Sequence, residues 1–186
     1  MLTYVTSNPG KAREARSYLD GVERVDYDYP EIQSDSLVEI AAHGALDAHR
    51  EVGRPVLVDD AGLFVDALGG FPGPYSAYVH ETVGVERVWR LADPESDHRA
   101  SFRAVLAYCD AATRERQSDG VHTFDGRVTG RLVSPRGDGG FGYDPIFEYD
   151  GQTFAEMEPE EKNAVSHRGR ALEQFAEWYH RERLDG

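Results

Sequence analysis

The chain has 186 residues, and its 34 aspartates and glutamates outnumber its 20 lysines and arginines, which gives a formal net charge of −14. Such an acidic balance argues against a nucleic-acid partner or an anionic membrane partner, because both would repel the chain. The hydrophobic content of 40 % suits a packed core, and the length fits a single domain spanning residues 1–186. No apolar stretch approaches the roughly 18 residues of a membrane span, so we expect a soluble, cytoplasmic protein.

Strand-like and helix-like segments alternate in the first third of the chain, which predicts an α/β domain with a central mixed β-sheet flanked by helices. In chain order, we predict a strand at Leu2–Thr6, a helix at Lys11–Leu19, a strand at Val25–Tyr29, a helix at Leu37–Glu51 that ends near Gly53, and a buried strand at Val56–Val58.

The same alternation continues to the C-terminus. We predict a helix at Val85–Leu91, an apolar segment at Ser101–Tyr108, a pair of strands within 122–133, and a last strand at Phe147–Tyr149. Ser166 has the character of an N-cap for a long final helix, with Leu172, Phe175, Ala176 and Tyr179 on one face. The single cysteine, Cys109, lies in an apolar run, which predicts a buried, inert thiol.

The chain contains only two lysines, Lys11 and Lys162, among 18 arginines. Lysine carries a compact point charge with three donors, which suits binding of a polyphosphate. Both lysines lie in segments suited to phosphate. The alternative is that two lysines merely remain in a composition that prefers arginine.

The segment Thr6-Ser7-Asn8-Pro9-Gly10-Lys11 joins a predicted strand to a predicted helix. Free amides at a helix N-terminus, hydroxyl groups and a lysine together favour an anion. The same residues are equally typical of an ordinary strand–turn–helix connection with a Ser or Asn cap.

Two aspartates, Asp59 and Asp60, follow the buried run at Val56–Val58. In open α/β sheets, sites form beyond the carboxyl ends of the strands, and paired carboxylates there can hold Mg²⁺ and accept a proton from water. The alternative is a turn, because the sequence Asp-Asp-Ala-Gly is also typical of turns.

Two further segments favour a nucleotide. Glycines flank Phe141 and Tyr143 in 139–145, so either ring is available to stack on a base, although a glycine-rich turn with core aromatics fits equally well. The second segment, Lys162–Arg168, supplies a cation and donors at the predicted start of the last helix, where solvated charges are the alternative.

Six segments occur in the order found in one protein family: Thr6–Lys11, Pro30–Gln33, Asp59–Leu63, Gly70–Ser76, Phe141–Pro145 and Glu160–Arg168. The chain resembles the inosine triphosphate pyrophosphatases, also called XTP/dITP diphosphatases, from Leu2 to about Trp178. The resemblance implies an active-site cleft between two lobes and Mg²⁺-dependent hydrolysis of ITP, dITP and XTP to the monophosphate and pyrophosphate. It also suggests a homodimer, with the loop 69–75 either at an interface or forming a packed turn.

The resemblance also implies a role for each matching residue. Asp60 would be the general base and, with Glu31, would bind the metal, while Asp59 would support the site. The substrate would contact Thr6, Ser7, Asn8, Pro9, Gly10, Lys11 and Lys162 through its phosphates, Phe141, Gly142, Tyr143 and Asp144 through its nucleoside, and His167 and Arg168 through its purine edge.

The chain departs from the family at Ala61, where serine is common, so we expect the backbone of Ala61 to contact the substrate without a hydroxyl. Glu39 is a further acidic residue that could replace Glu31 at the metal. Two alternative functions stay open. One is a nucleotide sensor that no longer hydrolyses its ligand, and the other is a pyrophosphatase with a different base preference.

Acidity combined with lysine depletion is typical of proteins adapted to high salt. At 1 M ionic strength the Debye length falls to about 3 Å, so repulsion within an acidic surface is weak. We predict a higher melting temperature in molar KCl than in low salt, measured by thermal denaturation. Equal melting temperatures in the two buffers would contradict this hypothesis.

Overall fold

The computed structural model describes residues 2–116 and 120–184. Within them a seven-stranded sheet has the order β2-β1-β3-β4-β5-β6-β7. Its strands are β1 (Leu2–Val5), β2 (Val22–Val25), β3 (Val56–Val65), β4 (Arg99–Cys109), β5 (His122–Leu132), β6 (Phe147–Tyr149) and β7 (Gln152–Thr153). β1 pairs in parallel with β2 and β3, whereas β6 pairs antiparallel with β5 and β7. The predicted α/β fold with a mixed sheet is therefore confirmed.

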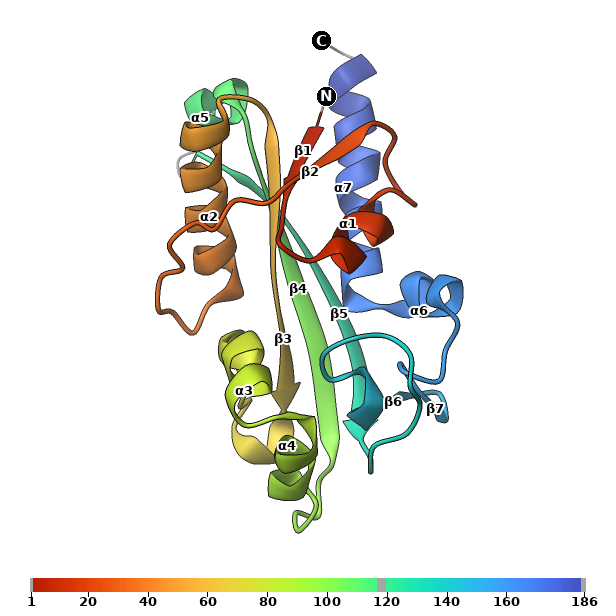
Figure 1. The fold of residues 1–186 in the computed structure, drawn as a ribbon. Coiled ribbons are helices and arrows are strands. Elements are labelled where there is room, and N and C mark those ends of the chain that lie inside the picture. The colour runs from red at the N-terminus through yellow and green to blue at the C-terminus, as the bar shows by residue number, and fades with distance from the viewer. Residues whose placement is uncertain (1, 117–119, 185–186) are drawn as a thin grey trace. The chain divides into compact units, whose positions relative to one another are not determined.

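The helices alternate with these strands along the chain (Figure 1). They are α1 (Pro9–Ala15), α2 (Leu37–Val52), α3 (Ser76–Thr82), α4 (Val85–Ala92), α5 (Ala111–Arg116), α6 (Pro159–Val165) and α7 (His167–Leu184), with short 3-10 turns at Asp66–Leu68, Gly73–Tyr75 and Asp144–Ile146. Within the described part of the chain, no helix is both long enough and apolar enough to span a membrane.

The residues form two compact units. The first unit comprises Met1–Asp60, Ala104–Gly126 and Arg168–Gly186, and the second comprises Ala61–Arg103 and Arg127–His167. Three of the boundaries fall inside β3, β4 and β5, so each of these strands contributes residues to both units. Because the chain passes between the units within strands, no Gly-rich or Pro-rich linker marks the division in the sequence.

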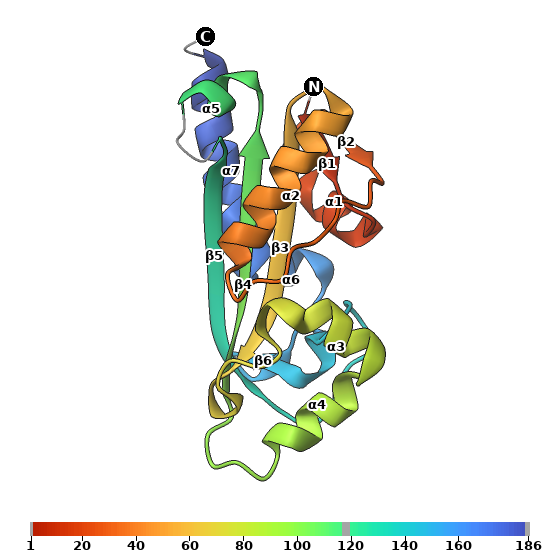
Figure 2. The same ribbon diagram turned by 90° about the vertical axis from the view of Figure 1, so that its left-hand side faces the viewer.

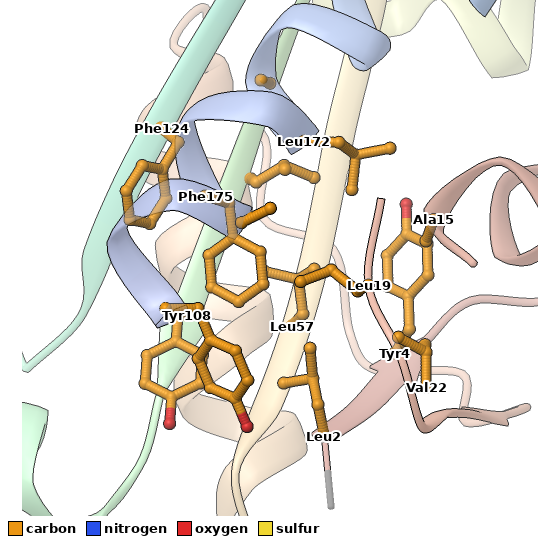
Figure 3. Packing of buried hydrophobic residues seen from close by; sticks show 14 of the residues in the cluster. Leu2, Tyr4, Ala15, Leu19, Val22, Leu57, Tyr108, Phe124, Leu172 and Phe175 are labelled. Carbon is orange, nitrogen blue, oxygen red and sulfur yellow. The ribbon is translucent and has the colours of Figure 1, made fainter. Parts of the chain in front are cut away.

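The core of the first unit lies between its strands and two helices, α1 and α7 (Figure 3). Leu57 of β3 and Phe124 of β5 pack with Phe175 of α7 and Leu19 after α1. The predicted apolar face of the last helix is confirmed, because all four of its residues are buried in this cluster. Helix α2 covers the opposite face of the same strands (Figures 1 and 2).

The second unit has its own core. Phe102 of β4 lies at its centre, with ring centroids 4.6 Å from Phe147 and 5.8 Å from Phe154. Val79 of α3 and Val88 of α4 complete the cluster. Each unit thus has its own apolar core, which holds its strands and helices in place.

Helix α2 forms as the sequence predicts. The Ser36 side chain accepts a hydrogen bond from the backbone N–H of Glu39 at 3.3 Å, and Gly53 ends the helix in the left-handed conformation, with φ of 68°. Both features are standard helix signals, which explains why the boundaries were predictable.

The predicted strand at Val25–Tyr29 is wrong, because β2 ends at Val25. The alternating tyrosines contact α2. The hydroxyl of Tyr27 donates to Asp47 at 2.8 Å, and the ring of Tyr29 lies so close to Gly44 that a Cβ there would be 2.5 Å from it. The period-two pattern therefore reports contacts with one helix face.

Other differences concern short elements. The pair of strands predicted within 122–133 is one continuous strand, β5, and β7 rather than β6 lies at the end of the sheet. Helices α3, α5 and α6 were not predicted; they have six or seven residues each, too few to give a helical period. Cys109 is buried and free, as predicted, and burial raises the pKa of its thiol to about 11.

Candidate active site

The turn between β1 and α1 is built by its own side chains. The hydroxyl of Thr6 accepts a hydrogen bond from the backbone N–H of Asn8 at 3.1 Å, and the Asn8 side chain accepts one from the N–H of Gly10 at 2.8 Å. Asn8 is the N-cap of α1, and Pro9 occupies the first helical position. The predicted strand–turn–helix is confirmed, and it presents Lys11 from the first turn of α1.

Lys11 contacts a buried carboxylate of the central strand β3. Its Nζ lies 3.1 Å from Oδ1 of Asp59. The other oxygen of Asp59 accepts a hydrogen bond from Nε of Arg168 at 3.0 Å, and Nη1 of Arg168 donates to Glu14 at 3.2 Å. Asp59, Glu14 and Arg168 are buried, whereas 23 % of the Lys11 side chain is exposed. Lys11 therefore joins a buried charge network of the first unit to its surface.

Burial opposes ionisation of Asp59, but the positive charges of Lys11 and Arg168 outweigh it and hold the pKa of this carboxyl well below its usual range. In the same way, Asp59 and Glu14 overcome the effect of burial on Arg168 and raise its pKa. Asp59 therefore remains charged and is a poor proton acceptor. This geometry suits the supporting role predicted for it.

Asp59 and Asp60 do not lie in a turn. They lie in the middle of β3, which continues to Val65, so the turn alternative is wrong. Successive side chains of a strand point to opposite faces, which separates the two carboxylates: Asp59 is buried against α1 and α7, while Asp60 is half-buried. The strand gives two adjacent aspartates different surroundings.

The charges of several carboxylates act on the phenol of Tyr29. Burial raises the pKa of Tyr29, and the nearby charges of Asp59, Glu31 and Asp60 raise it further. The two predicted metal ligands, Glu31 and Asp60, are thus both among the charges that act on this phenol. Glu39, the alternative ligand, accepts a hydrogen bond from Ser34 at 2.7 Å on the exposed first turn of α2.

The predicted magnesium site rests on two carboxylates, those of Glu31 and Asp60. Within residues 2–116 and 120–184, no group of three or more His, Cys, Asp or Glu side chains could hold a metal. Mg²⁺ in nucleotide enzymes commonly uses one or two carboxylates together with phosphate oxygens and water. Glu31 and Asp60 supply carboxylates of this kind, and their role as metal ligands stays a prediction.

The second unit contributes the other lysine. Lys162 lies in α6, not at the start of the last helix as predicted, and its Nζ contacts Oδ2 of Asp144 at 2.5 Å. The same Nζ lies 4.2 Å above the ring of Phe141. Phe141 is 39 % exposed, whereas Tyr143 is buried and its hydroxyl donates to the backbone oxygen of Ser76 at 2.9 Å. Of the two aromatic rings, Phe141 is the one available for stacking, beside Gly142.

His167 and Arg168 are adjacent in the chain but enter different networks. His167 stacks on Phe102 in the second unit, with ring centroids 4.8 Å apart. Arg168 joins the charge network of the first unit through Asp59 and Glu14. Their assignment to the purine edge stays a prediction, and the contacts of Arg168 give it a further role in holding Asp59.

Sequence reasoning missed Glu14 and Tyr29. Glu14 is buried in α1, as are Ala12 and Ala15 of the same helix. A buried acidic side chain requires a partner. Its position three residues after Lys11, on the same side of a helix, was the available signal. Tyr29 gave no separate signal, because the period-two pattern suggested a strand.

The family model described as the Ham1 family matches residues 2–178. The chain belongs to the Ham1 family. It is 51 % identical over 183 residues to the dITP/XTP pyrophosphatase of Methanopyrus kandleri, with 95 % of this chain and 94 % of that protein covered. It is 50 % identical to the dITP/XTP pyrophosphatase of Thermococcus kodakarensis, with 95 % and 96 % covered. The solved structure of a HAM1 protein from Coxiella burnetii matches with a TM-score of 0.83 and 32 % identity, covering 97 % of this chain and all of that one.

The charge network of this Ham1 protein makes its stability pH-dependent. Asp59→Asn should lower the free energy of unfolding at pH 7 by about 3 kcal/mol, because it breaks a buried ion pair. The folded-state pKa of Asp59 lies below the unfolded value of about 3.9, so its contribution is full above that pH and is lost as the pH falls towards the lowered pKa.

Urea denaturation of both proteins from pH 7 to pH 3 measures this effect. The difference in free energy of unfolding between the unaltered protein and Asp59→Asn should become smaller below about pH 4. Asp20→Asn, at an exposed position of the same unit, is the control and should leave stability unchanged. A difference in free energy of unfolding that does not vary with pH would contradict the lowered pKa of Asp59.

Proposed function

We propose that this protein hydrolyses deaminated purine nucleoside triphosphates (ITP, dITP and XTP) to the monophosphate and pyrophosphate, and so removes them from the nucleotide pool. The observation that carries this proposal is the pairing of each lysine with a buried aspartate, Lys11 with Asp59 and Lys162 with Asp144. These are the two lysines of the segments that carry the likeness to the Ham1 family. Relatives about half identical in sequence are named dITP/XTP pyrophosphatases.

The reaction places different demands on the two aspartates of β3. A water oxygen attacks the α-phosphorus, the bond from that phosphorus to the α–β bridging oxygen breaks, and pyrophosphate leaves with the bonding electron pair. The proton of the water passes to Asp60, the general base. Asp59 is unsuited to that task because its pKa is held low, and a useful base has a pKa closer to the working pH.

The lysines position the phosphates. Catalysis of this kind depends mostly on orientation and on stabilising negative charge. Lys11 is fixed by Asp59 yet remains partly exposed, so further donors of its ammonium group can face phosphate oxygens. Mg²⁺ bound by Glu31 and Asp60 would supply neutralisation of the triphosphate charge in a strongly acidic chain.

The oxygen at C6 of the base separates the substrates from ATP, whereas guanine shares this oxygen and must be excluded at another position, C2. A hydrogen-bond donor facing that oxygen accepts hypoxanthine and xanthine, while the amino group of adenine would leave two donors facing each other. We assign the donor to the segment His167–Arg168 and stacking of the base to Phe141, whose ring is exposed. Ala61 would contribute only its backbone.

We also propose a homodimer located in the cytoplasm, where nucleoside triphosphates are used. Aromatic side chains of the second unit are available for a dimer interface, because Phe71 and Tyr75 are 39 % and 42 % exposed. Sedimentation of the purified protein would test the dimer directly.

Asp60→Asn should reduce turnover of ITP by roughly 10²- to 10⁴-fold, the usual contribution of a general base, while the circular dichroism spectrum stays unchanged. Pyrophosphate release is measured with Mg²⁺ on ITP, XTP, GTP, ATP and pyrimidine triphosphates. The unaltered protein should prefer ITP and XTP. Asp20→Asn, which is exposed, should retain full activity. Near-normal turnover in Asp60→Asn would falsify the assignment of the base.

Lys11→Arg and Lys162→Arg should each lower kcat/KM for ITP by roughly 10- to 100-fold, because a planar guanidinium cannot place its charge where the ammonium lies. The matched control is Arg13→Lys, an exposed site in the same helix as Lys11, where exchange of the two cations should have no effect. If both arginine variants are fully active, lysine scarcity is an accident of composition.

A further inference from the structure

The side chain of Asp144 connects the glycine-rich loop to α6 within the second unit. Its Oδ2 accepts a hydrogen bond from the backbone N–H of Phe141 at 2.6 Å and one from Nζ of Lys162 at 2.5 Å. The Asp144 backbone is also fixed, because its oxygen accepts a hydrogen bond from the N–H of Ala155 at 3.3 Å. One aspartate therefore sets both the position of a lysine and the path of the loop.

A glycine, Gly140, leaves space for the carboxylate of Asp144. Gly140 has a φ of +71°, and a Cβ added there would lie 2.1 Å from Oδ2 of Asp144. Any other residue would therefore strain the backbone and displace the carboxylate. The glycine beside Phe141 is explained by the close approach of Asp144.

Lys162 depends on this carboxylate. The lysine is buried, and a buried ammonium is stable only when it is paired and hydrogen-bonded. The charge of Asp144 and the faces of Phe141 and Phe154, whose ring centroids are 4.2 and 5.8 Å from Nζ, surround the ammonium. Because an ammonium has three donors, the contact with Asp144 orients the others.

We infer that Asp144 is a positioning residue that holds Lys162 and the Phe141 backbone in place for the triphosphate. Oδ2 already accepts two hydrogen bonds, which is the capacity of one carboxylate oxygen. This inference rests on the proposed function, but it can be tested by binding alone.

The test compares Asp144→Asn with the unaltered protein, using inorganic tripolyphosphate, which has no base, as the probe. Calorimetric titration in the presence of Mg²⁺ should show binding weakened by roughly 10- to 100-fold, because a hydrogen-bonded charge pair is lost. The ratio of kcat/KM for ITP to that for GTP should change little. Unchanged tripolyphosphate affinity together with an altered ITP-to-GTP ratio would overturn the proposal in favour of base reading.

Coupling to Lys162 is tested by a double-mutant cycle with Lys162→Met. If Asp144 acts through Lys162, the double variant should bind tripolyphosphate no more weakly than Lys162→Met alone, whereas independent effects would multiply and contradict the proposal. Asp138→Asn is the matched control, since Asp138 is exposed in the same loop region and should bind normally.

Folding provides a second readout. Asp144→Asn leaves a buried ammonium without its counter-charge, and should lower the melting temperature. Adding Lys162→Met removes that ammonium, so the double variant should melt at a higher temperature than Asp144→Asn. A double variant that is less stable would refute the pairing, even if neither protein is active. Failure of the unaltered protein to hydrolyse ITP would instead overturn the proposed function and leave these binding and melting results standing.

Discussion

The buried carboxylate of Asp59 is the constraint on which the first unit depends. A charged group inside a protein is tolerated only when its partners are fixed, and Asp59 takes its partners from two helices, Lys11 from α1 and Arg168 from α7. These helices cover the same face of the strands, so the ion pairs and the apolar cluster around Leu57 and Phe175 hold one arrangement together. Packing supplies most of the free energy, and the charges specify which helix turn faces β3.

The second unit also pairs a lysine with a buried aspartate, but on different elements. There a buried aspartate, Asp144, holds a lysine of α6 and the loop that carries Phe141. In both units a lysine is thus placed by an aspartate and not by a flexible side chain alone. This arrangement lets a chain of net charge −14 hold positive charge at defined points.

Much of the fold could be predicted because local signals agree with the tertiary structure. Ser36 and Gly53 mark the ends of α2, and the apolar face of α7 has a helical period. The failures have physical causes. The two strands predicted within 122–133 are one strand, β5, and Gly126 is buried inside it. The helices α3 and α6 have seven residues each, and tertiary contacts rather than periodicity stabilise them.

The candidate site was likewise only partly predictable from the sequence. The turn at Thr6–Lys11 is encoded locally, since Asn8 caps the helix that carries Lys11. The pairing of Lys162 with Asp144 joins residues 18 positions apart, and that of Arg168 with Glu14 joins residues 154 positions apart, so neither leaves a pattern in the sequence. Resemblance to a family located Lys162, Asp144 and Arg168 but not Glu14, and only the folded chain shows which of these residues hold the others.

The departure at Ala61 follows from how β3 is held beyond Asp60. Gly62, the residue after Ala61, lies so close to the 3-10 turn Gly73–Tyr75 that a Cβ there would be 2.1 Å from the backbone oxygen of Gly73. Ser76 fixes this contact, because its hydroxyl accepts from the N–H of Leu63 at 2.8 Å and donates to the oxygen of Gly73 at 2.6 Å. The backbone of β3 is therefore positioned by Gly62 and Ser76, and not by the side chain at position 61. A hydroxyl can be lost at Ala61 while the strand that carries Asp60, the proposed general base, keeps its path.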